Sequence, residues 1–267
     1  MHPYLEHSVP VAIAHRGGAL EQPENSMRAF EAAITLGYTY LETDAQATSD
    51  GVVIAFHDDM LDRATDLRGP VEQRTHAEIS VARVSGTERI PVLQEVLTAW
   101  PNACFNIRVH SDAVISPLAR VLRVANCLDR VCLASNSAKR LDLMREIFGE
   151  RLCTALGPGD LSQLRRAAMG LPHRRLAGGC AQVPERTTLG GLLPWRLNER
   201  FLATAHKLGI PVHVATINEP AEMERLIELG VDGITTDRPS TLREVMQAQG
   251  LWLRNAPVLR AGVRQIH

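Results

Sequence analysis

The sequence lacks several features that would assign it to a broad class at once. Its 267 residues carry a net charge of −1, which gives no reason to expect binding to nucleic acid or to an anionic membrane. No apolar run reaches the roughly 20 residues of a membrane-spanning helix, so no stable membrane insertion is expected. Residues 1–7 lack the basic and apolar regions of a signal peptide. We therefore expect a cytoplasmic protein.

The cysteines and the basic residues also lack an informative pattern. None of the five cysteines belongs to a C-x-x-C pair, and four of them lie in or beside apolar, strand-like runs. This pattern favours small buried hydrophobic residues in a reducing compartment. Lysine is scarce, with Lys139 and Lys207 as the two lysines among 29 basic residues. A surface arginine in this chain therefore carries little information by itself.

Short apolar runs alternate with helical patterns along most of the chain. The helical segments have apolar residues at i, i+3, i+4 and i+7, and several of them end in glycine. Strands are expected at residues 11–14, 40–47, 104–109, 131–134, 153–156, 176–181, 211–215 and 233–235. Helices are expected at residues 26–36, 92–100, 114–125, 138–148, 161–169, 198–208, 221–229 and 240–249.

Eight strands alternating with eight helices predict an α/β fold, a single (β/α)₈ TIM barrel. The predicted domain covers residues 1–267, with its core at about 11–248. The rival fold is a doubly wound open sheet, but its first turn would need a G-x-G-x-x-G phosphate loop, which residues 15–20 do not provide. Residues 50–90 break the alternation. After a turn and a returning strand at 52–56, they are predicted to be an inserted excursion that covers the barrel mouth.

The predicted strand at residues 40–47 carries two carboxylates on one face. Glu42 and Asp44 are two residues apart, and side chains alternate along a strand. Two carboxylates that point into a barrel repel each other and lose hydration unless a cation lies with them. A hard divalent ion, Mg²⁺ or Ca²⁺, takes such oxygen ligands. The alternatives are an exposed strand face or neutralisation by arginine.

Two histidines are predicted to join these carboxylates. The first strand runs directly into His15 and Arg16, and the strand that returns from the turn ends at His57. Because the return brings His57 back toward the first strands, both imidazoles, both carboxylates and Arg16 should meet at one mouth of the barrel. Gly17 and Gly18 are expected to keep the next turn open for a substrate.

Short motifs in a fixed order connect these residues to a known family. They are HRG at 15–17, PEN at 23–25, E-x-D at 42–44, DG at 50–51, HD at 57–58 and R-x-T at 63–65. In this order they resemble the opening of the glycerophosphodiester phosphodiesterase family. The segment HVATINEPAEMERLIELGVDGITTDRP resembles the last two βα units of that family. The resemblance extends from residue 11 to about residue 248.

The resemblance implies a barrel hydrolase that cleaves a small-molecule phosphodiester into glycerol 3-phosphate and an alcohol. It implies that His15 and His57 are the general acid/base pair, which suits imidazoles that titrate near neutral pH. Glu42 and Asp44 would hold the divalent ion, which would neutralise charge on the phosphoryl oxygens. Arg16 would bind the phosphate with its fork of donors.

The third predicted strand departs from the family pattern. Where the family usually reads N-I-E-I-K, this chain has Arg108 in place of the acid and His110 in place of the lysine. Both share the inward face of the strand, so both are candidate substrate-binding residues. We expect Arg108 to form an ion pair with the carboxylates and to weaken or abolish metal binding. Asp112 is a possible substitute ligand further along the strand.

Three readings of the sequence stay open. The first is a glycerophosphodiester phosphodiesterase with both histidines functional and a metal site altered by Arg108. The second is a catalytically weak or inactive homologue that binds a phosphate-bearing ligand between Arg16, Arg108 and His110. The third is another phosphoryl transfer on the same barrel, such as a phospholipase D-like reaction through a cyclic phosphate.

Overall fold

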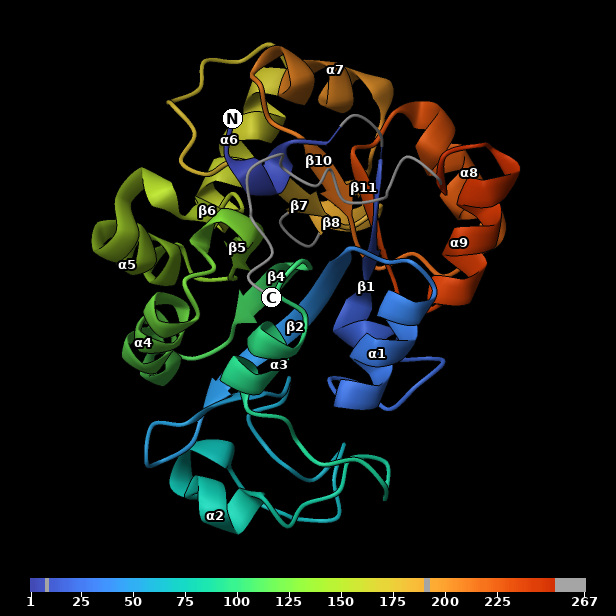
Figure 1. Cartoon of the computed structure of the whole chain (residues 1–267). Coiled ribbons are helices and arrows are strands. Elements are labelled where there is room, and N and C mark those ends of the chain that lie inside the picture. Colours follow the sequence, from blue (N-terminus) through green and yellow to red (C-terminus); the bar gives the residue numbers. More distant parts are fainter. Residues whose placement is uncertain (8–9, 190–192, 253–267) are drawn as a thin grey trace, which may run out of the picture.

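The computed structural model describes residues 1–7, 10–189 and 193–252, and a closed sheet of parallel strands lies at its centre (Figure 1). The strands follow one another around the barrel in the order β6-β5-β4-β2-β1-β11-β10-β7, and one bridge between Ala155 and Cys180 joins β6 to β7. This arrangement confirms a TIM-barrel-like α/β fold. The barrel strands are β1 (Val11–Ala14), β2 (Tyr40–Ala47), β4 (Cys104–Val109), β5 (Val131–Ala134), β6 (Cys153–Thr154), β7 (Ala181–Val183), β10 (Val212–Val214) and β11 (Gly233–Thr236).

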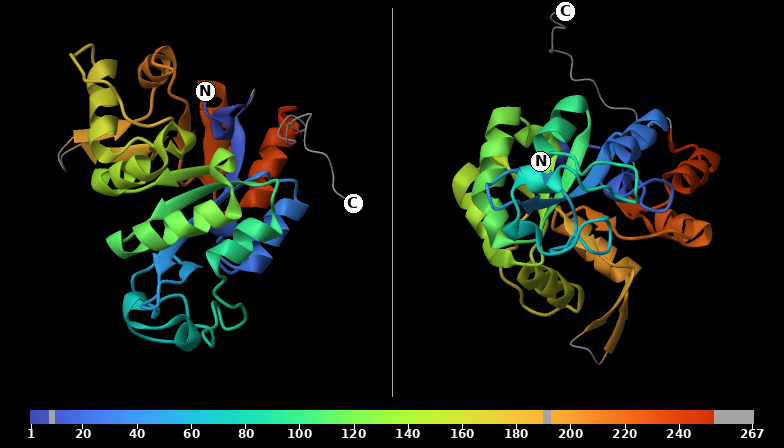
Figure 2. Two further views of the ribbon diagram at one scale, coloured as in Figure 1. Left: turned by 60° about the vertical axis from the view of Figure 1, so that its left-hand side comes forward. Right: turned by 90° about the horizontal axis from the view of Figure 1, so that it is seen from below.

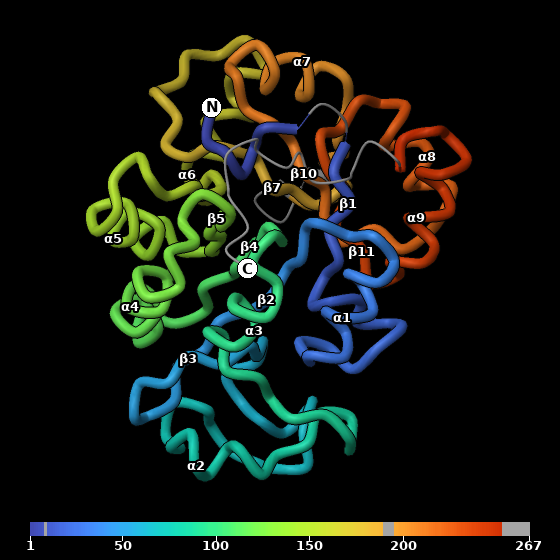
Figure 3. The backbone as a smooth tube through the Cα atoms, in the orientation of Figure 1, coloured from blue at the N-terminus to red at the C-terminus, as the bar shows by residue number. Residues whose placement is uncertain are grey.

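Helices surround the strands as an outer layer (Figure 3). Ser26 caps α1 by accepting a hydrogen bond from the Ala29 amide, and Asn198 caps α7 through the Phe201 amide. The apolar faces of these helices pack on the outer faces of the strands in one large core. The layer consists of α1 (Met27–Thr35), α3 (Leu93–Ala99), α4 (Ile115–Ala125), α5 (Ala138–Phe148), α6 (Pro158–Ala168), α7 (Glu199–Lys207), α8 (Pro220–Leu229) and α9 (Pro239–Ala248).

The prediction of the sixth strand was displaced toward the N-terminus. The apolar run at 176–181 predicts a strand there, whereas β7 begins at Ala181. Gly178 has a φ of +135°, and a Cβ at this position would lie 2.9 Å from the carbonyl oxygen of Ala155. The chain therefore crosses closely over β6 in a conformation that only glycine adopts readily, and it becomes extended two residues later.

The returning strand predicted at 52–56 is present, whereas a short helix and a hairpin were not predicted. The segment after β2 contains β3 (Val53–Ala55), which runs antiparallel to β2, and then the short helix α2 (His76–Ile79). Thr75 and Glu78 form a capping box at the start of α2. Beyond β7 there is a hairpin of β8 (Arg186–Leu189) and β9 (Leu193–Arg196). In Figure 2 the α2 segment and the N-terminus lie at opposite ends of the barrel.

The barrel interior changes in character from one end to the other. At the base, the N-terminal residues Tyr4 and Leu5 close the barrel over a buried cluster that includes Tyr40 of β2. In the middle, Asn106 and Gln182 exchange two hydrogen bonds across the interior. At the C-terminal ends of the strands the inward side chains are charged. No helix in residues 1–7, 10–189 and 193–252 is long and apolar enough to cross a membrane. The tail beyond Gly250 has a weak hydrophobic pattern and no assigned role. Its residues from 253 onward lie outside the described part of the chain.

Candidate active site

The two carboxylates of β2 lie inside the barrel at its C-terminal mouth. Glu42 is 2% exposed and Asp44 is fully buried. Glu42 Oε2 accepts a hydrogen bond of 3.0 Å from the backbone amide of Arg16. Burial and the charge of Asp44 raise the pKa of Glu42. Glu42 is thus a buried acid whose negative charge is only partly compensated by neighbouring donors.

Asp44 is better compensated than Glu42. Its Oδ1 lies 2.6 Å from His110 Nε2, and its Oδ2 accepts a hydrogen bond of 3.1 Å from Asn25. Arg16 Nε lies 3.2 Å from the same Oδ2, as an ion pair without hydrogen-bond geometry. Burial alone would raise the pKa of Asp44, but the hydrogen bond and charge of His110, together with the charges of Arg16 and His57, lower the pKa to about 2.

His15 lies where β1 ends, between two carboxylates. Its Nδ1 is 2.6 Å from Asp237 Oδ1, and its Nε2 is 3.8 Å from Glu42 Oε2. Burial would lower the pKa of His15, but the charge of Glu42 and the hydrogen bond with Asp237 raise it above the ordinary value. Asn218 donates to Asp237 Oδ2 at 2.9 Å and so fixes the acid that orients the imidazole.

His57 has the same kind of partner on the other side of the mouth. Its Nδ1 is 2.5 Å from Asp58 Oδ1, and Arg63 donates to the other oxygen of Asp58. Arg63 also donates to Glu24, which accepts a second hydrogen bond from Arg16. The His57 ring meets the His110 ring edge to face at 4.7 Å between centroids. The side chain of His57 is 33% exposed, so one edge of the ring is open to the mouth.

Arg108 occupies the inward position next to Asp44, as the strand register pairs the two residues. The predicted ion pair between Arg108 and the carboxylates was wrong. In the described part of the chain, the basic side chains that pair with Asp44 are Arg16 and His110. The charge of Arg108 still lowers the pKa of Glu42 against the larger effect of burial. Its guanidinium therefore remains available for an anion that enters the mouth.

The two glycines after Arg16 serve packing rather than an open turn. A Cβ at Gly17 would lie 2.7 Å from Ala29 of α1, and one at Gly18 would lie 2.6 Å from Pro239 of α9. Both glycines have positive φ, and Arg16 itself has a φ of 50°. Held in this left-handed conformation, Arg16 directs its amide to Glu42 and its side chain to the Asp44 side of the mouth.

The predicted substitute ligand lies outside the site, whereas two residues that follow the last barrel strands belong to it. Asp112 does not reach the mouth, because it is 61% exposed and pairs with Arg140 at 2.6 Å. Asp237 and Asn218, which the sequence did not identify, belong to the site through their contacts with His15 and with each other. The signal that could have identified Asp237 is its place at the end of the last barrel strand, where its side chain faces the end of the first.

With this geometry established, comparison with known proteins gives a consistent result. Residues 15–241 match the model of the glycerophosphoryl diester phosphodiesterase family. The chain belongs to this family. It is 34% identical over 259 residues to "Probable glycerophosphodiester phosphodiesterase 2" of Mycobacterium tuberculosis, covering 93% of this chain and 95% of the relative. It is 30% identical over 256 residues to a glycerophosphodiester phosphodiesterase of Caldanaerobacter subterraneus, covering 90% and 99%.

A solved structure shares the fold of this phosphodiesterase family member. It is an Oleispira antarctica phosphodiesterase in complex with the product sn-glycerol-3-phosphate, with a TM-score of 0.74 and 20% identity over 90% of this chain and 97% of that one. Family membership supports hydrolysis of glycerophosphodiesters, which is a phosphoric diester hydrolase activity.

The possible metal ligands at the mouth differ from the predicted pair. Among the described residues, Asp44, His57 and His110 place one ligand atom each within 4.8 Å of one another. Glu42, the predicted partner of Asp44 as a ligand, is not in this group. The set therefore combines two imidazoles with one carboxylate, which is a mixture typical of transition-metal ions rather than of Mg²⁺ or Ca²⁺.

These residues fit a hard divalent ion poorly. Both oxygens of Asp44 already accept from or pair with His110, Asn25 and Arg16. An ion at this point would have to displace the contact between His110 and Asp44. Arg108 stands beside Asp44 where a third acid would complete an oxygen cage, and its positive charge opposes a cation.

Proposed function

We propose that the protein hydrolyses glycerophosphodiesters to glycerol 3-phosphate and an alcohol, with His15 and His57 as the general acid/base pair. One arrangement carries the proposal. Each of these histidines has its Nδ1 hydrogen-bonded to an aspartate, Asp237 or Asp58, at 2.5 to 2.6 Å. A carboxylate acceptor holds the proton on Nδ1 and leaves Nε2 to exchange a proton with a substrate or with water.

The two histidines divide the proton transfers of hydrolysis between them. One accepts a proton from the attacking group as it approaches phosphorus, and the other donates a proton to the departing alkoxide. Their aspartate partners stabilise the imidazolium that forms in each step. Because the pKa of His15 is raised, His15 is protonated at a higher pH than an ordinary imidazole and suits the donor role.

Arginine supplies the positive charge that faces the phosphate. In our proposal Arg108 binds a non-bridging oxygen directly, because it forms no ion pair within the described residues, whereas Arg16 is divided between Glu24 and Asp44. His110 joins them as a donor to the phosphate when it leaves Asp44. A fixed guanidinium stabilises the charge that develops on the phosphoryl oxygens in the transition state.

We further propose that Arg108 replaces most of the effect of the divalent ion that the family resemblance implies. If Mg²⁺ or Ca²⁺ binds, Glu42 and Asp44 are the residues that would hold it, and the ion would neutralise charge on the phosphate. The compensated state of Asp44 and the position of Arg108 make this binding weak. Activity is therefore expected to depend little on added metal.

The segment at residues 50–90 is proposed to cover this mouth. Gln46 of β2 donates to Asp59 at 2.9 Å, and Arg63 donates to Glu24 at 2.5 Å. These contacts tie the segment to both sides of the site. A cover would exclude water from the substrate side and strengthen the electrostatic interactions below it.

The test is the release of glycerol 3-phosphate from glycerophosphocholine, measured with Mg²⁺, with Ca²⁺ and with a chelator. We expect turnover in all three conditions, and a loss of about 10²- to 10⁴-fold in His15→Ala and in His57→Ala. The matched control is His206→Ala, which removes a surface histidine that pairs with Asp232 and should leave the rate unchanged.

A second candidate function is the binding of a phosphate-bearing ligand between Arg16, Arg108 and His110 by a catalytically weak or inactive homologue. One observation favours it, namely the arginine at a position where the family usually has an acid. Micromolar binding of glycerol 3-phosphate by calorimetry, without turnover of any diester, would establish this function and reject hydrolysis. Turnover that is lost completely in chelator would reject the role given to Arg108.

A further inference from the structure

Three side chains at the barrel mouth lie close enough together to share one metal ion. They are Asp44 of β2, His57 in the chain that follows β3, and His110 directly after β4. One ligand atom from each lies within 4.8 Å of the other two. In the part of the chain that the structure describes, no other three histidine, cysteine or acidic side chains gather this closely.

The backbone holds these side chains in place from two sides. The Phe56 amide donates to the carbonyl oxygen of Asp44 at 3.1 Å, so the residue before His57 is tied directly to β2. The Arg140 guanidinium donates to the carbonyl oxygen of His110 and fixes the chain where β4 ends. Ligands that are positioned in this way before an ion arrives need little rearrangement to bind it.

Hydrogen bonds on the outer side of two of these groups leave one atom of each for an ion. Asp58 Oδ1 lies 2.5 Å from His57 Nδ1, which leaves Nε2 of the same ring as the ligand atom. Histidine ligands of metal ions usually have such a carboxylate on their other ring nitrogen. Asn25 donates to Asp44 Oδ2 at 3.1 Å, and Asp44 Oδ1 faces His110 Nε2.

The kind and spacing of these ligands fit an ion of the Zn²⁺ class. Two imidazoles and one carboxylate are ordinary ligands of Zn²⁺, whereas Mg²⁺ and Ca²⁺ take a larger set of oxygen atoms. With metal–ligand distances of about 2.1 Å, two ligand atoms of a tetrahedral ion lie about 3.4 Å apart. His110 Nε2 and Asp44 Oδ1 are 2.6 Å apart, so they must separate by about 0.8 Å to admit the ion. Small rotations of the two side chains achieve this.

We propose that a transition-metal ion of the Zn²⁺ class binds to Asp44, His57 and His110 and blocks the hydrolysis proposed above, on which this inference rests. His57 Nε2 gives its lone pair to the ion and loses the proton exchange that catalysis needs, and His110 no longer donates to the phosphate. The proton between His110 and Asp44 leaves to solvent. Because Arg16 and Arg108 beside Asp44 oppose a cation, the binding is reversible.

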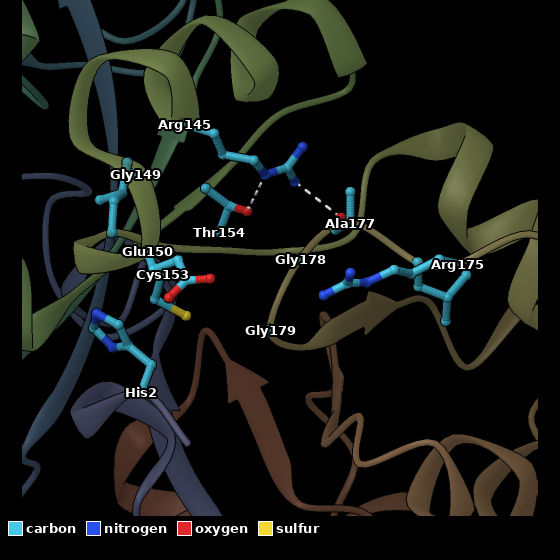
Figure 4. A pocket seen from close by; sticks show the side chains of 12 residues that line it. His2, Arg145, Gly149, Glu150, Cys153, Thr154, Arg175, Ala177, Gly178 and Gly179 are labelled. Carbon is cyan, nitrogen blue, oxygen red and sulfur yellow. Dashed lines mark hydrogen bonds between the residues drawn. The ribbon is translucent and has the colours of Figure 1, made fainter.

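A cavity at the base of the barrel offers no competing site. Its volume is about 560 Å³, and Figure 4 shows His2, Glu150 and Cys153 among the residues that line it. Both His2 nitrogens are engaged, by the Tyr4 amide at 3.1 Å and the Arg151 carbonyl oxygen at 3.2 Å. The Cys153 side chain is buried. We therefore expect no sulfur among the ligands of a bound ion.

The experiment is a titration of metal-free, full-length protein with Co²⁺. Its visible absorption bands report binding by nitrogen and oxygen ligands, and an intense near-ultraviolet band reports sulfur. We expect visible bands that saturate at one equivalent and disappear when Zn²⁺ is added, without the sulfur band. His57→Asn and His110→Asn should each weaken Co²⁺ binding at least tenfold. Circular dichroism checks that each variant is folded.

The matched control is His206→Ala. His206 also contacts an aspartate, Asp232, at 2.7 Å, but no third ligand lies beside this pair within the described residues. The variant should keep the wild-type affinity for Co²⁺. Equal losses of affinity in His206→Ala and His110→Asn would place the ion elsewhere and overturn the proposal.

The block is measured as glycerol 3-phosphate release. Saturating Zn²⁺ should lower the rate at least tenfold, and a chelator should restore it. His110→Asn should need at least tenfold more Zn²⁺ for half-inhibition of its own metal-free rate. The proposal is overturned if active wild-type protein gives no visible Co²⁺ bands, if the sulfur band accompanies them, or if Zn²⁺ leaves the rate unchanged or raises it. Co²⁺ binding as expected in protein that hydrolyses no diester under any condition would confirm the metal site and reject the proposed function instead.

A second measurement on wild-type protein covers variants that fail to fold. Diethyl pyrocarbonate modifies accessible imidazoles, and the side chains of His57 and His206 are 33% and 42% exposed. Zn²⁺ should slow modification of His57 at least tenfold, as read by peptide mass spectrometry, while modification of His206 stays unchanged. Equal rates at His57 with and without Zn²⁺ would also overturn the proposal.

Discussion

The two ends of the barrel are built from the same strands, yet they differ in almost every physical property. On β2, Tyr40 lies in the apolar base, and Asp44 lies four residues further at the charged mouth. On β4, Cys104 packs against the base and Arg108 faces the mouth. A strand thus changes from a supporting to a reactive role within two or three inward positions, since only alternate residues face inside.

The difference between the two ends shows how the molecule compensates its buried charges. At the mouth each buried acid has polar partners: the Arg16 backbone amide donates to Glu42, while His110, Asn25 and the Arg16 guanidinium contact Asp44. The base contains no such ion pairs among the residues of its cluster, and its polar groups are thiols and phenols. Stability should therefore depend on packing at the base and on paired charges at the mouth, while catalysis should depend on the mouth alone.

The largest expected effect comes from removing the best-compensated charge of the mouth. Asp44→Ala leaves His110 and Arg16 without their buried partner, so the free energy of unfolding should fall by about 3 to 5 kcal/mol and hydrolysis should cease. Urea denaturation and the glycerol 3-phosphate assay measure these changes. Asp112→Ala is the control, because its ion pair is exposed to solvent and its loss should leave the free energy of unfolding nearly unchanged. Equal losses in the two variants would show that burial at the mouth does not decide stability.

The base should respond in the opposite way, with a loss of stability and no loss of turnover. Tyr4→Ala removes a fully buried ring and should lower the free energy of unfolding by about 3 kcal/mol, with kcat unchanged. Tyr4→Phe is the matched control. The Tyr4 hydroxyl is buried without a hydrogen-bond partner in the described structure, so its removal should cost nothing. A large fall of kcat in folded Tyr4→Ala would contradict the expectation that the base affects stability but not catalysis.

Arg108→Glu sharpens the comparison within the mouth itself. The substitution turns the positive neighbour of Asp44 into a third acid, so Mg²⁺ should bind at least tenfold more tightly and activity should become sensitive to chelator. Calorimetry with Mg²⁺ and the rate assay report the two effects. Arg120→Glu on the surface of α4 makes the same charge change far from the carboxylates and should alter neither. Unchanged Mg²⁺ affinity together with activity that stays insensitive to chelator in Arg108→Glu would show that Arg108 does not control metal binding at the mouth.

The smallest expected effect is a dependence of stability on pH through His15. The pKa of His15 is raised in the folded state, so its contribution to stability is fully present below the unfolded value of about 6.5 and is lost as the pH rises through the folded pKa. Wild-type protein should therefore lose stability between neutral and mildly alkaline pH relative to His15→Asn. Asp237→Asn should reduce this slope, because it removes one of the two acids that raise the pKa. Parallel curves for all three proteins would contradict the coupling.

The sequence was sufficient for most of the barrel because strong local patterns specified it. The strands β1, β2, β4 and β5 coincide with the predicted ranges, since each is a short apolar run between clear turn signals. The start of β7 was displaced, because the backbone approach at Gly178 is set by β6 and not by neighbouring residues. The helix α2 and the hairpin of β8 and β9 were missed, since such short elements depend on contacts with the rest of the chain.

The composition and order of residues by themselves determined the fold class, the inward parity of Glu42 and Asp44, and the two histidines that follow strand ends. Tertiary structure alone decided the partners: Asp237 for His15 across 222 positions of sequence, and His110 rather than Arg108 for Asp44. The physical reason is that periodicity fixes the direction of a side chain relative to its own strand. Which charge, proton or thiol it meets depends on barrel closure, which no local pattern encodes.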